Sequence, residues 1–97
     1  MSSTEENKDP FDSLLEKLEN EKWPNSYMFK FILPGSNPEK MRLVKDEFGT
    51  KKVEMSVNKS KNGKYISLSV KVKKMYSAQA VIDIYRNVSK IEGVMAL

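Results

Sequence analysis

Apolar and polar residues alternate strictly over two neighbouring stretches in the second half of the chain. The first stretch runs from Val53 to Val57 and the second from Ile66 to Val72. This period of two is typical of strands that bury one face and expose the other. Asn62-Gly63 lies between the stretches, and this dipeptide is a strong signal for a tight hairpin turn. The pattern therefore predicts a β-hairpin.

A two-residue turn at that position also fixes the pairing of the two strands. All apolar side chains then lie on one face of the hairpin, and the polar side chains lie on the other. A slip by one residue would turn one strand over and expose its apolar set. The predicted pairs are Val57 with Leu68, Met55 with Val70, Val53 with Val72, Asn58 with Ser67, Ser56 with Ser69 and Glu54 with Lys71.

A short amphipathic helix is predicted near the N-terminus, from about Pro10 to Glu19, with Asp9 as its N-cap. The polar segment before it, Met1–Lys8, is predicted to be a disordered tail. A helix this short is marginal in water, so we expect it to pack within its own chain. Its apolar residues, at helical spacing, are Phe11, Leu14, Leu15 and Leu18.

Four further elements complete the pattern. Tyr27–Leu33 is apolar on both faces, which suits a central strand. Asn37 is the expected cap of a second helix, which ends near Gly49. Ser77 is the expected cap of a third helix, and Val94–Leu97 is a short final strand.

The elements after the first helix follow in the order β-α-β-β-α-β. With right-handed crossovers this order gives the ferredoxin-like arrangement. We therefore predict an α+β fold, a ferredoxin-like βαββαβ sandwich with an antiparallel four-stranded sheet. Residues 1–22 are assigned to the tail and the short helix, and residues 23–97 to the ferredoxin-like domain.

The composition narrows the chemistry. The chain of 97 residues contains no cysteine and no histidine. It therefore has no disulfide, no thiolate metal site and none of the commonest general bases. Catalysis by carboxylates or lysines remains open, but we expect a protein that is not an enzyme and uses no cofactor and no metal. The sequence shows no signal-peptide core and no apolar run of membrane-spanning length, so a cytoplasmic protein without membrane contact is expected.

The net charge is +4, and lysines are concentrated between Lys51 and Lys74. This excess weakly favours an anionic partner. A solvated lysine surface that keeps a small domain soluble is the simpler interpretation.

Several segments agree, in order, with a known family. A Ser-Lys-Asn-Gly-Lys-Tyr turn leads into an alternating Ser/Val strand over Ser60–Val70, and Tyr27–Ile32 forms the first strand. Tyr85 lies in the middle of the last helix, before Lys90-Ile91 and Val94–Leu97. In these segments the chain resembles the YbeD-like family of small uncharacterised bacterial proteins. The resemblance implies a ferredoxin-like fold similar to ACT-type regulatory domains, which sense small molecules. Labels of this family also mention lipoate regulation. The resemblance implies no catalytic residues.

The first candidate site is the loop after the first strand, at Gly35, Ser36 and Asn37. In ACT domains the corresponding loop often binds an amino acid and carries Asn-x-Pro-Gly. The Pro-Gly pair is present here, but Ile32 stands at the asparagine position. Free amides at a helix start suit a carboxylate or phosphate. A simple turn with an N-cap is the plainer interpretation.

The second candidate site is the open face of the sheet, where Lys30, Tyr65, Lys71 and Lys73 are expected. RNA-recognition domains share this fold and stack bases on aromatic residues there. A single tyrosine among serines is a weak stacking platform, so nucleic-acid binding is the less favoured hypothesis. The N-terminal helix is a local candidate to cover this face.

The sequence therefore predicts a non-enzymatic regulatory or adaptor domain, ACT-like in fold. It would act by contact with an unknown protein partner or by sensing a small ligand. The alternative is binding of RNA or another nucleic acid through the lysine-rich open face. We expect a monomer or a weak homodimer.

Overall fold

The computed structural model describes residues 11–97. The predicted tail, the predicted cap at Asp9 and the start of the helix at Pro10 lie outside the described residues. The elements are α2 (Asp12–Glu19), β1 (Asn25–Pro34), α3 (Pro38–Asp46), β2 (Val53–Lys59), β3 (Tyr65–Met75), α4 (Ala78–Ser89) and β4 (Met95–Ala96). The last strand is thus shorter than predicted, and β3 is longer.

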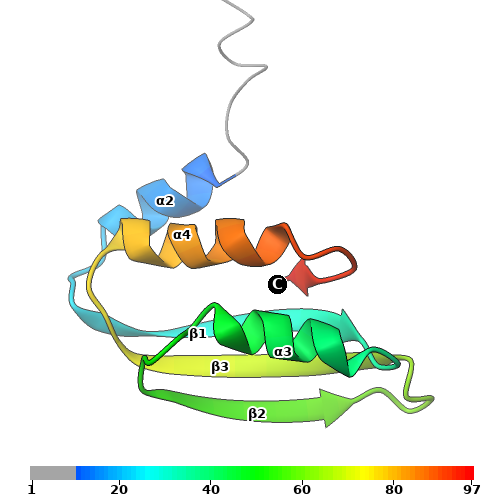
Figure 1. Cartoon of the computed structure of the whole chain (residues 1–97). Coiled ribbons are helices and arrows are strands. Elements are labelled where there is room, and N and C mark those ends of the chain that lie inside the picture. The colour runs from blue at the N-terminus through cyan, green and yellow to red at the C-terminus, as the bar shows by residue number, and fades with distance from the viewer. Residues whose placement is uncertain (1–10) are drawn as a thin grey trace, which may run out of the picture.

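The four strands form one antiparallel sheet in the order β2-β3-β1-β4. β1 and β3 are therefore central, as predicted. The three helices lie on the same side of this sheet (Figure 1). This is the α+β, ferredoxin-like arrangement that the order of elements predicted.

The hairpin between β2 and β3 has the predicted register. Val57 pairs with Leu68 and Glu54 with Lys71, and the four other predicted pairs are also present. The loop is longer than predicted, because the amide of Ser60 donates to the Tyr65 carbonyl oxygen at 2.9 Å across four intervening residues. One extra residue on each side of Asn62-Gly63 leaves the register unchanged, since both strands are lengthened equally.

The core lies between the sheet and the helices. Phe29 and Phe31 on β1 are fully buried, and Phe48, in the turn after α3, packs against both rings. Val44 of α3 is also fully buried. Side chains that alternate along a strand share one face, which explains why one side of the sheet carries this set. The buried residues are Leu18, Phe29, Phe31, Leu33, Val44, Phe48, Leu68, Val70, Val72, Met75, Ala78, Val81, Ile82, Ile84, Tyr85 and Val88.

Helix α2 packs within its own chain, but not where the sequence suggested. Phe11 stacks on Tyr85 of α4 with ring centroids 6.2 Å apart. Leu18 is buried, and its carbonyl oxygen accepts a hydrogen bond of 2.8 Å from Trp23 Nε1. α2 therefore lies beside α4 on the helical side of the sheet (Figure 1). The expectation that it would cover the open face is wrong, because its apolar residues pack onto the apolar surface of α4.

A β-bulge interrupts β3 near its end. Tyr27 pairs with Val72 and Asn25 with Met75, so two residues of β3, Lys73 and Lys74, stand against one residue of β1. Both lysines are exposed, whereas Val72 and Met75 on either side are buried. A regular strand would have turned one of the two lysines towards the core.

Candidate functional site: a groove between α3 and the hairpin

The helices cover the central strands and leave the inner face of β2 partly bare. Val57 points to the helical side, yet 44% of its surface is exposed. An open groove of about 600 Å³ lies there, between α3 and the hairpin. Its lining residues are Leu33, Pro34, Gly35, Asn37, Pro38, Met41, Arg42, Lys45, Val57, Lys59 and Ile66.

The lining divides into an apolar part and a cationic part. Most of the lining side chains are aliphatic, including Met41, Val57 and Ile66. The charged lining residues are Arg42 and Lys45 from α3 and Lys59 from the end of β2, and all three are cations. An apolar surface with a few placed charges is typical of small-molecule sites.

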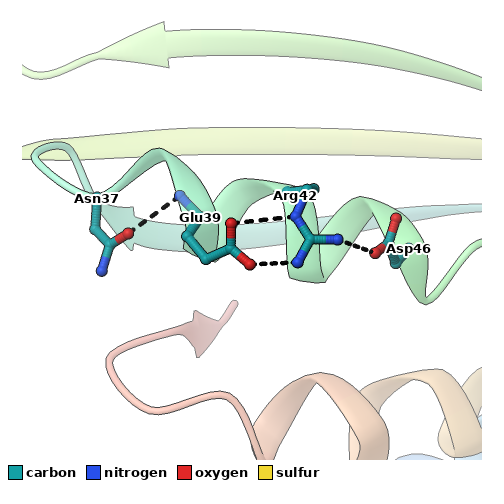
Figure 2. A network of polar contacts seen from close by, with 4 residues as sticks. All are labelled: Asn37, Glu39, Arg42 and Asp46. Carbon is teal, nitrogen blue, oxygen red and sulfur yellow. Dashed lines mark hydrogen bonds and ion pairs between the residues drawn. The ribbon is translucent and has the colours of Figure 1, made fainter.

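Arg42 is held by two carboxylates of its own helix (Figure 2). Its Nη2 and Nε contact both carboxylate oxygens of Glu39, the latter at 3.1 Å, and its Nη1 donates to Asp46 at 2.8 Å. The hydrogen bonds from Arg42 hold the pKa of Glu39 below its ordinary value, and the same contacts raise the pKa of Arg42. The ion pair is therefore complete above the ordinary glutamate pKa and is lost as pH falls through the lowered one.

The two lysines of the groove differ from Arg42 in this respect. Within residues 11–97, neither Lys45 nor Lys59 takes part in an ion pair. Their ammonium groups can therefore bind an incoming anion without first breaking a protein contact. Arg42 would have to leave Glu39 or Asp46 to do the same.

The predicted ligand loop forms one end of the groove. Asn37 lines it and caps α3, because its Oδ1 accepts a hydrogen bond of 3.1 Å from the Glu39 amide. Gly35 also lines it, whereas Ser36 is exposed and does not. The structure therefore joins two of the three predicted residues to the groove. Whether they bind a ligand stays a prediction.

Gly35 has a packing role that the sequence did not reveal. Its amide donates to the Lys64 carbonyl oxygen at 2.8 Å, which ties the loop before α3 to the hairpin loop. A Cβ at this position would lie 2.2 Å from the Gly63 carbonyl oxygen. Only glycine permits this close approach of two backbones.

Sequence patterns did not indicate Lys45, Lys59 and Val57 as groove residues. Val57 has the alternation of a core residue, and Lys45 and Lys59 look like ordinary surface lysines. No sequence signal identified them, because the uncovered surface depends on where α3 lies over the sheet.

The alternative site residues all lie on the open face, but not in one cluster. Lys30 is paired with Ser69, next to Lys71 in the sheet, whereas Tyr65 pairs with Pro34 at the hairpin end. Tyr65 and Lys73 are eight residues apart along β3, which corresponds to about 26 Å. Lys73 also contacts Glu54 at 3.5 Å, which reduces the positive charge of the face.

Two further features are absent from residues 11–97. No group of three or more acidic residues in this part of the chain is arranged to hold a metal ion. In the same range, no helix has the length and apolar character needed to cross a membrane.

A solved structure has the same fold. Protein HP0495 from H. pylori, determined in solution, superimposes with a TM-score of 0.65 over 94% of this chain and 97% of that one. The two sequences are 18% identical, so the likeness shows the fold alone. No curated protein matches this chain.

The sequence profile of one family covers most of the chain. It matches residues 19–97, from the end of α2 through β4. The family carries the description "Protein of unknown function (DUF493)" and is the YbeD-like family of the sequence resemblance. With this match and the fold in agreement, the chain belongs to the DUF493 family.

Proposed function

We propose that the protein is a non-enzymatic regulatory or adaptor module that binds an aliphatic carboxylate in the groove between α3 and the hairpin. One observation carries the proposal: an apolar groove whose lining charges are all positive. Its volume of about 600 Å³ is ample for a small molecule. Ligand sites commonly span roughly 300–1,000 Å³.

The arrangement of the lining suggests how such a ligand is held. Its hydrocarbon part would cover Val57, Met41 and Ile66, which removes their exposed surface from water. Its carboxylate would bind Lys45 and Lys59, whose ammonium groups carry no other ion pair in the described chain. Medium-chain acids such as octanoate and lipoate combine these two features. The lipoate-regulation label that the sequence resemblance implies names an acid of the same class.

The regulatory part of the proposal rests on what the chain lacks and on its fold. Without histidine or cysteine, it has neither of the side chains most often used for acid–base and nucleophilic catalysis near neutral pH. The loop after β1, which binds ligands in ACT domains, here forms one end of the groove. Binding would be read out by a protein partner, and the domain itself would be a monomer or a weak dimer.

Thermal-shift assays and titration calorimetry with octanoate and lipoate test the proposal. We expect saturable binding, and octanol should bind much more weakly because it lacks the charge. The double variant Lys45→Gln/Lys59→Gln should bind octanoate about two- to thirtyfold more weakly, since each exposed ion pair contributes about 0.2–1 kcal/mol.

The matched control is Lys61→Gln/Lys64→Gln, which removes the same charge from the hairpin loop outside the groove. It should bind octanoate as the unchanged protein does. Equal losses in both double variants would show that only the net charge matters, and the proposed site would be wrong. Absence of any stabilisation by either acid would also reject it.

The open face does not support nucleic-acid binding equally well. Tyr65 and Lys73 lie at opposite ends of β3, and Glu54 pairs with Lys73. A base stacked on Tyr65 would therefore have its phosphates far from Lys73. The open face is therefore a weak candidate for nucleic-acid binding.

A further inference from the structure

A second hollow lies at the other end of the hairpin strands. There β2 begins after α3, and β3 ends before α4, which Figure 1 shows on the side away from the hairpin loop. The hollow has a volume of about 370 Å³. It is lined by Lys51, Lys52, Lys73, Lys74 and Tyr76.

The charge of this hollow is strongly one-sided. Four of its five lining residues are lysines, and none is acidic. Lys73 pairs with Glu54 at 3.5 Å, so the positive charge of the hollow comes mainly from its other three lysines. Lys51, Lys52 and Lys74 take part in no ion pair within residues 11–97. The site therefore attracts anions with several charges.

The backbone contributes directly to this clustering. The bulge lets Lys73 and Lys74 both point away from the core, although they are adjacent in a strand. The amide of Lys73 donates to the Lys52 carbonyl oxygen at 3.4 Å, which holds the two lysine pairs next to each other. Bulges often re-aim side chains at functional sites.

Tyr76 adds an aromatic surface to the lysines. Its side chain is among the most exposed large ones of the described chain, with 70% of the residue's surface accessible. Lys74 Nζ lies 5.6 Å from its ring centroid, so a charge and a stacking surface are already combined. An exposed tyrosine among lysines suits a ligand with both phosphates and flat rings.

We propose that this basic hollow, formed by Lys51, Lys52, Lys73, Lys74 and Tyr76, binds a single-stranded segment of nucleic acid. One base stacks on Tyr76, and the neighbouring phosphates contact the lysines. The site is separate from the carboxylate groove, with which it shares no residue. The inference therefore does not depend on the proposed function.

Fluorescence anisotropy with a labelled oligouridine at low salt tests this site. The unchanged protein should bind it, and Lys51→Gln/Lys52→Gln/Lys74→Gln should weaken binding at least tenfold. Tyr76→Ala should weaken it by about tenfold, because stacking on an aromatic side chain stabilises each base appreciably. These residues are exposed, so circular dichroism should show folded variants.

Matched controls lie at the hairpin end. Tyr65→Ala removes an exposed tyrosine that is not in the hollow, and Lys59→Gln/Lys61→Gln/Lys64→Gln removes the same charge. Both should retain nearly full oligouridine affinity. No binding at low salt would overturn the proposal, as would equal losses in the two lysine triples. If Tyr76→Ala binds unchanged, or inorganic polyphosphate competes as well as oligouridine, the hollow is a general polyanion site and the nucleic-acid assignment is wrong.

Discussion

The two ends of the β2–β3 hairpin are built from the same strands, yet one offers a mainly apolar surface and the other a mainly charged one. At the hairpin end, a regular ladder directs Val57 and Ile66 to the helical side, where α3 leaves them partly bare. At the other end, the bulge breaks the alternation and directs two adjacent lysines outward. A regular ladder thus produces an apolar surface with a charged rim. A single extra residue produces a cluster of like charges.

The salt dependence of ligand affinity should differ most strongly between the two ends. The affinity of oligouridine for the basic hollow should fall about a hundredfold or more between about 50 and 500 mM salt, as expected for three or four phosphate contacts on a single strand. Octanoate binding should fall only a few-fold, because burial of its hydrocarbon part does not depend on charge. Parallel titrations measure both slopes, and equal slopes would remove the distinction between the sites.

The close approach at the hairpin end is open to a direct test. Gly35→Ala should lower the free energy of unfolding by about 1–3 kcal/mol, since the added methyl group overlaps the Gly63 carbonyl oxygen and a backbone has to move. In Gly63→Ala the added Cβ would meet no atom within 4 Å. Residue 63 has φ +71°, however, and this left-handed conformation costs an alanine roughly 1–2 kcal/mol. Urea denaturation compares the two. Octanoate affinity should fall for Gly35→Ala while oligouridine affinity is retained, and the reverse result would contradict the assignment of the ends.

Deletion of Lys74 tests the role of the bulge at the other end. It should restore a regular ladder with Met75 still facing the core, because Asn25 and Tyr27 would then pair in one register. Oligouridine affinity should fall by about tenfold, and by more than in Lys74→Gln, which removes the charge but keeps the bulge. A deletion variant that binds no worse than Lys74→Gln would show that the bulge does not organise the site. Anisotropy and a thermal melt provide the readouts.

The smallest effect is expected at Arg42. Glu39→Gln should release part of the Arg42 guanidinium group, which can then contact the carboxylate of octanoate. Octanoate affinity should rise about two- to fivefold, which corresponds to the free energy of an exposed ion pair. Glu47→Gln changes the charge equally at the other end of α3 and should have no such effect. In an NMR titration of the unchanged protein, Glu39 should titrate below the ordinary glutamate pKa, and Arg42→Ala should return it upwards. Unchanged affinity in Glu39→Gln would show that Arg42 does not contact the ligand.

Local patterns predicted the fold well because they are set by neighbours in sequence. The alternation in β2 and β3 determined every predicted pair of the hairpin, and Asn37 and Ser77 cap their helices as expected. The position of α2 was predicted incorrectly, because an apolar stripe on a helix does not specify which apolar surface receives it. Both α4 and the open face were eligible partners.

The candidate sites were harder to predict because they depend on what is left uncovered. The turn and cap signals predicted Gly35 and Asn37. The groove that these residues line exists only because α3 leaves Val57 partly exposed. The basic hollow depends on a bulge. The run from Val70 to Met75 contains one residue too many for strict alternation, and that mismatch was the available signal.

The contact between Gly35 and the hairpin loop also fixes one end of α3. It clamps α3 to the hairpin at the end where the helix begins, through the bond from the Gly35 amide to the Lys64 carbonyl oxygen. The other end of α3 is held by Phe48, which is buried against Phe29 and Phe31 and leads through Gly49 into Lys51 and Lys52. Because both ends of the helix are anchored, the groove and the basic hollow stand at a fixed spacing, although they have no residue in common.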